Sequence, residues 1–125
     1  MARPLRVLVA DDNPLNLRIA ARLLRDMGHS GVLVNGGRQA LQALQTQAFD
    51  VMLLDVTMPD MGGLEALAEL RTLERAGRRH TPVIMVTAYD LPEDRRRLLD
   101  AGADGYVAKP LDAERLAAEL ARVVP

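Results

Sequence analysis

Short apolar runs alternate with segments of helical periodicity along the chain, and this alternation limits the possible folds more than any other feature of the sequence. Each run ends at a polar or turn residue, as strands commonly do. The predicted strands are residues 5–10, 32–34, 51–54, 83–86 and 106–108. Most of their positions are apolar, without a polar residue at every second place, which is typical of strands buried on both faces of a parallel sheet.

Between these runs, apolar residues recur with the period of an α-helix. Asn13 is the expected cap of the first helix, Pro14 fits its first turn, Gly28 ends it, and Asp112 is the expected cap of the fifth. The expected apolar stripes are Ile19, Ala20, Leu23, Leu24 and Met27; Ala40, Leu41, Leu44 and Ala48; Leu64, Leu67, Ala68 and Arg71; Leu98, Leu99 and Ala101; and Leu116, Leu120 and Val123. This alternation predicts a three-layer α/β sandwich, with a five-stranded parallel sheet and five helices.

Length and charge further narrow the class of protein to which the chain can belong. The 125 residues suit one domain spanning 1–125. With 16 basic and 17 acidic side chains the chain has no excess of positive charge. We therefore expect no direct contact with nucleic acid or membrane. No apolar run approaches the ~20 residues of a membrane helix, and the start does not resemble a signal peptide, so we expect a cytoplasmic location. The absence of cysteine excludes a disulfide or a thiolate metal site.

Polar residues that carry chemistry follow four of the five predicted strands. Asp11 and Asp12 follow the first strand, Asp55 the third, Thr87 the fourth and Lys109 the fifth. Ligands of open α/β sheets bind at the carboxyl ends of the strands. We therefore expect three carboxylates, a hydroxyl and an ammonium group to lie together at one edge of the sheet.

Three neighbouring carboxylates repel one another unless a cation lies among them. Mg²⁺ suits such a site because it takes oxygen ligands and keeps several waters. Each aspartate alone is explained as a cap or turn residue, and only their joint position favours a site. Asp55 closes a strongly apolar run, which makes it a candidate nucleophile toward phosphorus. Lys109, the only lysine of the chain, and Thr87 are the candidate ligands of the phosphoryl oxygens.

Four segments resemble the receiver domain of two-component response regulators: Val9–Asn13, Met52–Pro59, Val86–Ala88 and Gly105–Pro110. The resemblance spans almost the whole chain, and it implies a flavodoxin-like fold with strand order 2-1-3-4-5. The segments Asp11–Asn16 and Met58–Gly63 look more like receivers attached to hybrid sensor histidine kinases than like free-standing transcription factors.

The resemblance also implies a chemistry for the acidic residues. Asp55 would receive a phosphoryl group from a histidine kinase or a histidine phosphotransfer domain. Asp12, Asp55 and the backbone carbonyl of Thr57 would bind Mg²⁺, with Mn²⁺ as the alternative metal, and Asp11 would act largely through water.

Further residues have roles that the resemblance alone implies. Thr87 and Tyr106 would form a switch pair that reshapes the face of the fourth helix, fifth strand and fifth helix, which is also the face expected for a homodimer. Thr57 and Tyr89 match positions that tune the lifetime of the phosphoryl group. The Lys109–Pro110 bond would be cis, which is accessible because proline follows.

Two other functions compete with that of a phosphoacceptor receiver. A receiver-fold interaction module that works without phosphate would usually lack Asp55, Lys109 or the acidic pair, and all of these are present. A metal-dependent phosphatase resembling the haloacid-dehalogenase family needs a second acid two residues after its nucleophile, where this chain has Thr57. We therefore expect no turnover enzyme, only self-phosphotransfer and autodephosphorylation. His29 and His80 are interpreted as solvated loop residues.

Overall fold

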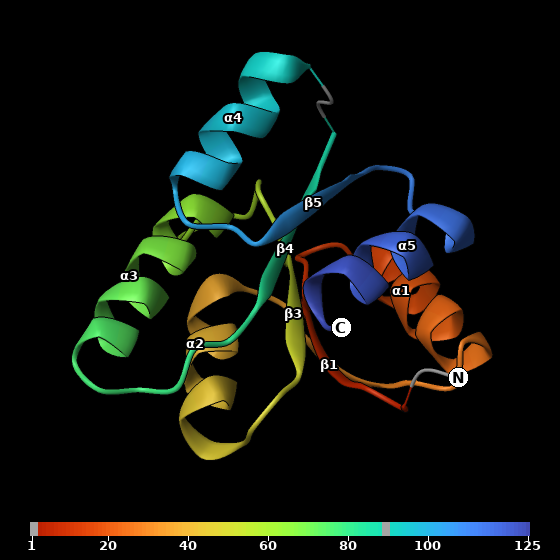
Figure 1. The fold of residues 1–125 in the computed structure, drawn as a ribbon, viewed down its shortest axis with the longest axis horizontal. Coiled ribbons are helices and arrows are strands. Elements are labelled where there is room, and N and C mark those ends of the chain that lie inside the picture. The colour runs from red at the N-terminus through yellow and green to blue at the C-terminus, as the bar shows by residue number, and fades with distance from the viewer. Residues whose placement is uncertain (1–2, 89–90) are drawn as a thin grey trace.

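The computed structural model describes residues 3–88 and 91–125. Five parallel strands form one sheet in the order β2-β1-β3-β4-β5, and a helix follows each strand (Figure 1). The elements are β1 (Arg6–Ala10), α1 (Pro14–Asp26), β2 (Ser30–Val34), α2 (Gly37–Thr46), β3 (Val51–Asp55), α3 (Gly63–Arg75), β4 (Val83–Thr87), α4 (Pro92–Asp100), β5 (Gly105–Ala108) and α5 (Ala113–Val123). The predicted three-layer α/β architecture and strand order are confirmed.

The sheet separates two apolar cores, one on each face. Leu24 of α1 and Leu116 of α5 pack on one face, whereas Leu41, Leu67 and Leu98 of α2, α3 and α4 pack on the other (Figure 1). Strands β3 and β4 are buried along their whole length, because both faces are covered by helices. The edge strand β2 is more exposed.

Three details of the predicted helices are wrong. Helix α2 ends at Thr46, whose hydroxyl donates to the Ala43 carbonyl, so Ala48 lies beyond the helix and is exposed. Ile19 and Leu99 do not belong to the buried stripes, since 39% and 44% of their surfaces remain exposed, and the stripe residues Ala68 and Ala101 are exposed as well. Asp112 occupies the cap position of α5, but its side chain makes no capping hydrogen bond. Within the described ranges, no helix is both long and apolar enough to cross a membrane.

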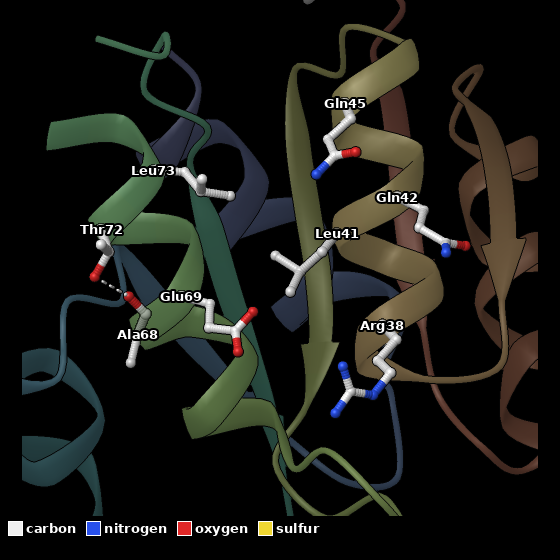
Figure 2. A pocket seen from close by; sticks show the side chains of 8 residues that line it. All are labelled: Arg38, Leu41, Gln42, Gln45, Ala68, Glu69, Thr72 and Leu73. Carbon is white, nitrogen blue, oxygen red and sulfur yellow. Dashed lines mark hydrogen bonds between the residues drawn. The ribbon is translucent and has the colours of Figure 1, made fainter. Parts of the chain in front are cut away.

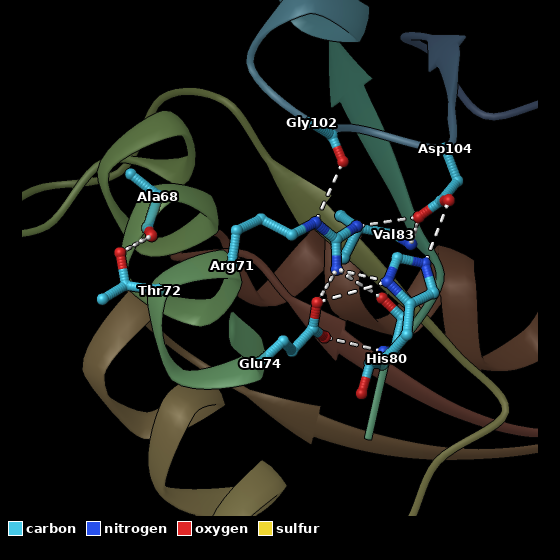
Figure 3. Close-up of polar contacts among 9 residues, drawn as sticks. Ala68, Arg71, Thr72, Glu74, His80, Val83, Gly102 and Asp104 are labelled. Carbon is cyan, nitrogen blue, oxygen red and sulfur yellow. Dashed lines mark hydrogen bonds and ion pairs between the residues drawn. The ribbon is translucent and has the colours of Figure 1, made fainter. Parts of the chain in front are cut away.

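A network of polar contacts ties α3 to the segment that enters β5 (Figure 3). The Arg71 guanidinium donates to Gly102 O at 3.0 Å, Glu74 Oε1 at 2.8 Å and Asp104 Oδ2 at 2.8 Å. The ring of His80 lies between the two carboxylates, 3.2 Å from an oxygen of each. His80 is therefore exposed but paired. His29 is half-buried, and its Nδ1 atom accepts from the Leu5 N–H at 2.9 Å, so the interpretation of both histidines as merely solvated is wrong.

Candidate functional site

Asp11, Asp12 and Asp55 lie together at the carboxyl edge of the sheet, each with an oxygen within 4.8 Å of the others. The register explains this, because β1 and β3 are neighbours that pair as far as Ala10 and Leu54, and the acids directly follow those residues. Asp11 and Asp55 retain only 5% and 3% of their surface, whereas Asp12 is exposed. The acid cluster is therefore buried at Asp11 and Asp55 and open to solvent at Asp12.

Lys109 reaches this cluster from the end of β5. Its Nζ atom lies 2.9 Å from Asp55 Oδ1 and 3.9 Å from Asp11 Oδ2. The Lys109 N–H donates to the Thr87 carbonyl at 2.7 Å, which joins the ends of β5 and β4. The Lys109–Pro110 peptide bond is cis, the conformation that the resemblance implies.

Backbone contacts fix both buried carboxylates. Asn13 N–H donates to Asp11 Oδ1 at 2.9 Å, and Thr57 N–H donates to Asp55 Oδ1 at 3.4 Å. The N-terminus of α3 packs directly on the end of β3, where a Cβ at Gly63 would collide with the backbone carbonyl of Asp55. Only glycine permits this close approach.

The sequence also predicts that the backbone carbonyl of Thr57 is a metal ligand. This role stays a prediction.

Burial and neighbouring charges both act on the pKa of Asp55. Burial is the main cause that raises the pKa of Asp55, and the negative charge of Asp11 raises it further. The hydrogen bond and charge of Lys109 act in the opposite direction. One ammonium therefore does not fully compensate the buried acids. Clustered carboxylate oxygens with one open side fit a hard divalent cation that keeps waters, as Mg²⁺ does.

Thr87 and Tyr106 lie on neighbouring strands. Thr87 is buried at the end of β4, opposite Ala108 of β5. Tyr106 is half-buried and lies two residues before Ala108 on β5. The guanidinium of Arg95 stacks over the Tyr106 ring, 5.4 Å from its centre. Tyr106 also lines a surface hollow of about 540 Å³ between α4 and α5. Tyr89, the other predicted lifetime residue, lies outside the described residues.

Sequence reasoning missed an apolar rim beside the acids. Leu15 and Ile19 of α1 keep 61% and 39% of their surface exposed, and Ile19 shares a small cavity with Lys109 and Pro110. Leu15 and Ile19 are four residues apart and so share a helix face. This second apolar face was the signal available in the sequence, but Ile19 was assigned to the core stripe.

A second hollow, about 520 Å³, lies between α2 and α3, with Arg38 and Glu69 among its lining residues (Figure 2). None of the site residues predicted from the sequence lines it.

Residues 7–121 match the family model of the response regulator receiver domain. The chain is 40% identical over 119 residues, 95% of its length, to the sensory/regulatory protein RpfC of Xanthomonas campestris and to the signal transduction histidine-protein kinase BarA of Escherichia coli. These matches span only 16% and 13% of those proteins.

Among solved structures, the receiver domain of the Pseudomonas aeruginosa sensor histidine kinase PA1611, which has a magnesium ion coordinated in its active-site cleft, superposes with a TM-score of 0.84. The two chains are 34% identical, and the match covers 98% of each.

Proposed function

The chain belongs to the response regulator receiver domain family, and on this premise we propose that Asp55 is its phosphoacceptor. One observation carries the proposal: a buried carboxylate at the end of β3 lies 2.9 Å from the only lysine of the chain and next to two further aspartates. This constellation supplies a nucleophile and a cation in one open cleft. The phosphoryl donor that fits the family is a phosphohistidine.

In the transfer step, a carboxylate oxygen of Asp55 attacks phosphorus and a P–O bond forms. The P–N bond to the donor histidine breaks, and the imidazole keeps the electron pair and takes up a proton. The Lys109 ammonium neutralises charge on the phosphoryl oxygens, and the Thr87 hydroxyl donates to one of them. Phosphoryl transfer needs little else from a protein beyond such positioning and charge neutralisation.

Asp12, Asp55 and the Thr57 carbonyl would hold Mg²⁺, with Asp11 acting through water; Mn²⁺ is the alternative metal. The relative with a magnesium ion in its cleft and the clustered carboxylates of this chain support the assignment. A bound divalent cation would balance the charge that gathers on the acids and the phosphoryl group. The protein's own part is to hold the two buried carboxylates with the backbone N–H groups of Asn13 and Thr57.

The partner is a histidine kinase or a histidine phosphotransfer domain in the cytoplasm. Support comes from the relatives, one of which is named as a histidine kinase, and from the exposed Leu15 and Ile19 beside the acids. Apolar side chains around a polar cleft suit a docked protein donor. The chain is not a turnover enzyme in this proposal, since it stores the phosphoryl group on itself and loses it by autodephosphorylation.

Thr87 and Tyr106 would pass the signal to the face of α4, β5 and α5. The new charge on Asp55 draws the Thr87 hydroxyl toward it, and Tyr106 turns inward to fill the space. The altered face then binds a partner or a second copy of the chain.

Mass spectrometry after incubation with acetyl phosphate and Mg²⁺ tests the phosphoacceptor. We expect the mass gain of one phosphoryl group, stable in acid and labile in base, and Asp55→Asn should abolish it. Asp60→Asn is the matched control, because Asp60 is an exposed aspartate on the following loop. A mass gain that persists in Asp55→Asn assigns the nucleophile elsewhere. Signalling that persists without any mass gain would instead favour an interaction module that works without phosphate.

A further inference from the structure

A cavity of about 270 Å³ lies between the α2–β3 loop and the α3–β4 loop. Both loops precede strands of the parallel sheet and lie at its amino edge (Figure 1). The cavity between them is therefore far from Asp55, which ends β3 at the carboxyl edge. Its charged lining residues are Arg78 and Arg79, and no carboxylate of the described residues lines it. Positive charge therefore gathers at this edge of a chain whose net charge is -1.

Arg78 is the unusual member of the pair. Its side chain is half-buried, and Nη1 is buried with no hydrogen-bond partner in ranges 3–88 and 91–125. The nearby Arg71 and Arg75, by contrast, donate to acceptors on α3. A charged N–H group that loses water without gaining an acceptor is unfavourable, and buried polar groups are rarely left so. A ligand oxygen that Arg78 can reach by a change of rotamer would relieve this cost.

Asp50, the acid whose pKa the charge of Arg79 lowers, does not meet this need. Asp50 Oδ1 accepts from the Arg3 guanidinium at 3.1 Å, and Asp50 Oδ2 accepts from the Arg6 N–H at 2.7 Å. The hydrogen bond from Arg6 is the main cause that lowers the pKa of Asp50, and the charges of Arg3 and Arg79 lower it further. Asp50 is thus ionised and already engaged, which leaves the two cavity arginines available to another anion.

We propose that this cavity binds a small phosphate monoester through Arg78 and Arg79. Two guanidinium groups match the charge of a phosphate dianion, and their planar donor forks match its oxygens. Gln47 also lines the cavity, and its amide NH₂ is a donor suited to a phosphate oxygen. The buried ring of Phe49 closes the cavity with an apolar wall. The inference does not use the acid cluster and is independent of the proposed function.

The first test is an NMR titration of the ¹⁵N-labelled chain with inorganic phosphate and with ribose 5-phosphate, without Mg²⁺. Chloride at equal ionic strength is the reference for simple screening. We expect saturable shifts of the backbone amides of residues 46–49 and 78–81 with both phosphates and not with chloride. Equal shifts with chloride, or no saturation with either phosphate, would overturn the proposal.

Variants then assign the ligands. Arg78→Gln and Arg79→Gln should each weaken phosphate binding about tenfold, since each removes one charge-assisted contact. Arg22→Gln, an exposed arginine of α1, is the matched control and should bind as the parent does. Because Arg79 is exposed, its variant keeps the fold testable if Arg78→Gln unfolds. Unchanged phosphate affinity in Arg79→Gln would show that the arginines are not the ligands.

Discussion

The Lys109 ammonium is a full ångström closer to an oxygen of Asp55, at 2.9 Å, than to one of Asp11, at 3.9 Å. A compact point charge with three donors suits this narrow space, whereas a guanidinium is larger and holds its donors in a fixed fork. Lys109→Arg should therefore slow phosphorylation by acetyl phosphate about tenfold or more although the charge is kept. Arg97→Lys on the exposed surface of α4 is the control. A normal rate in the Lys109 variant would show that any cation serves.

Metal affinity should distinguish the two adjacent acids. If Asp12 binds Mg²⁺ directly and Asp11 acts through water, Asp12→Ala should lose more affinity than Asp11→Ala, with a difference of about tenfold. The same order should appear in thermal stability, because a metal that binds only the folded chain raises its unfolding temperature. Calorimetric titration of both variants with Mg²⁺ measures the difference, and equal losses would contradict the assigned roles.

Occupancy of Asp55 should shift the side chain of Tyr106. The ring now lies under Arg95 and borders the hollow between α4 and α5. With beryllofluoride and Mg²⁺ bound, we expect a shift of population toward an inward rotamer, worth about 1–3 kcal/mol. Ring NMR signals of Tyr106 and methyl signals of Thr87 report it. If both stay unchanged while Asp55 is fully occupied, the signal leaves by another route.

Glu119 should contribute to stability in a pH-dependent way. Its carboxylate accepts from the Arg122 guanidinium and from the Tyr106 N–H at 2.9 Å. These contacts, that of Arg122 first, hold the pKa of Glu119 below its usual 4.5. Since the folded chain binds this proton less readily than the unfolded chain, the stabilisation is present above pH 4.5 and is lost as pH falls through the lowered pKa.

Glu119→Gln should accordingly lower the free energy of unfolding at neutral pH by about 1 kcal/mol. The difference from the parent should shrink in acid. Urea unfolding at neutral pH and at about pH 3 measures both values. Glu69→Gln, at an exposed position inside α3, should change neither. A loss that is equal at both pH values would show that the ionised carboxylate is not its source.

The acid cluster was predictable because parallel strands place their carboxyl ends at one edge. The end of the run Val51–Leu54 indicated that Asp55 lies at the same edge as Asp11, although not that their strands are neighbours. The order of the strands came from the family resemblance, since alternation alone does not fix which strands are neighbours.

Long-range side-chain pairs were not predictable from the sequence. His80 contacts Asp104, which is 24 residues away, and Arg71 contacts Asp104 across 33 residues, so no local pattern marks either pair. The prediction that Ile19 is buried was wrong for another reason. Helical periodicity shows which apolar residues share a helix face, but not whether the sheet extends far enough to cover each of them.

The absence of a side chain at Gly63 determines which substitutions the fold tolerates at this position. A Cβ at residue 63 would meet the backbone carbonyl of Asp55, so even a methyl group has no room there. In a saturation-mutagenesis library, position 63 should therefore accept glycine alone, although it is not acidic, binds nothing and has no charge. Its tolerance profile would resemble that of a reactive residue, while its cause is purely steric.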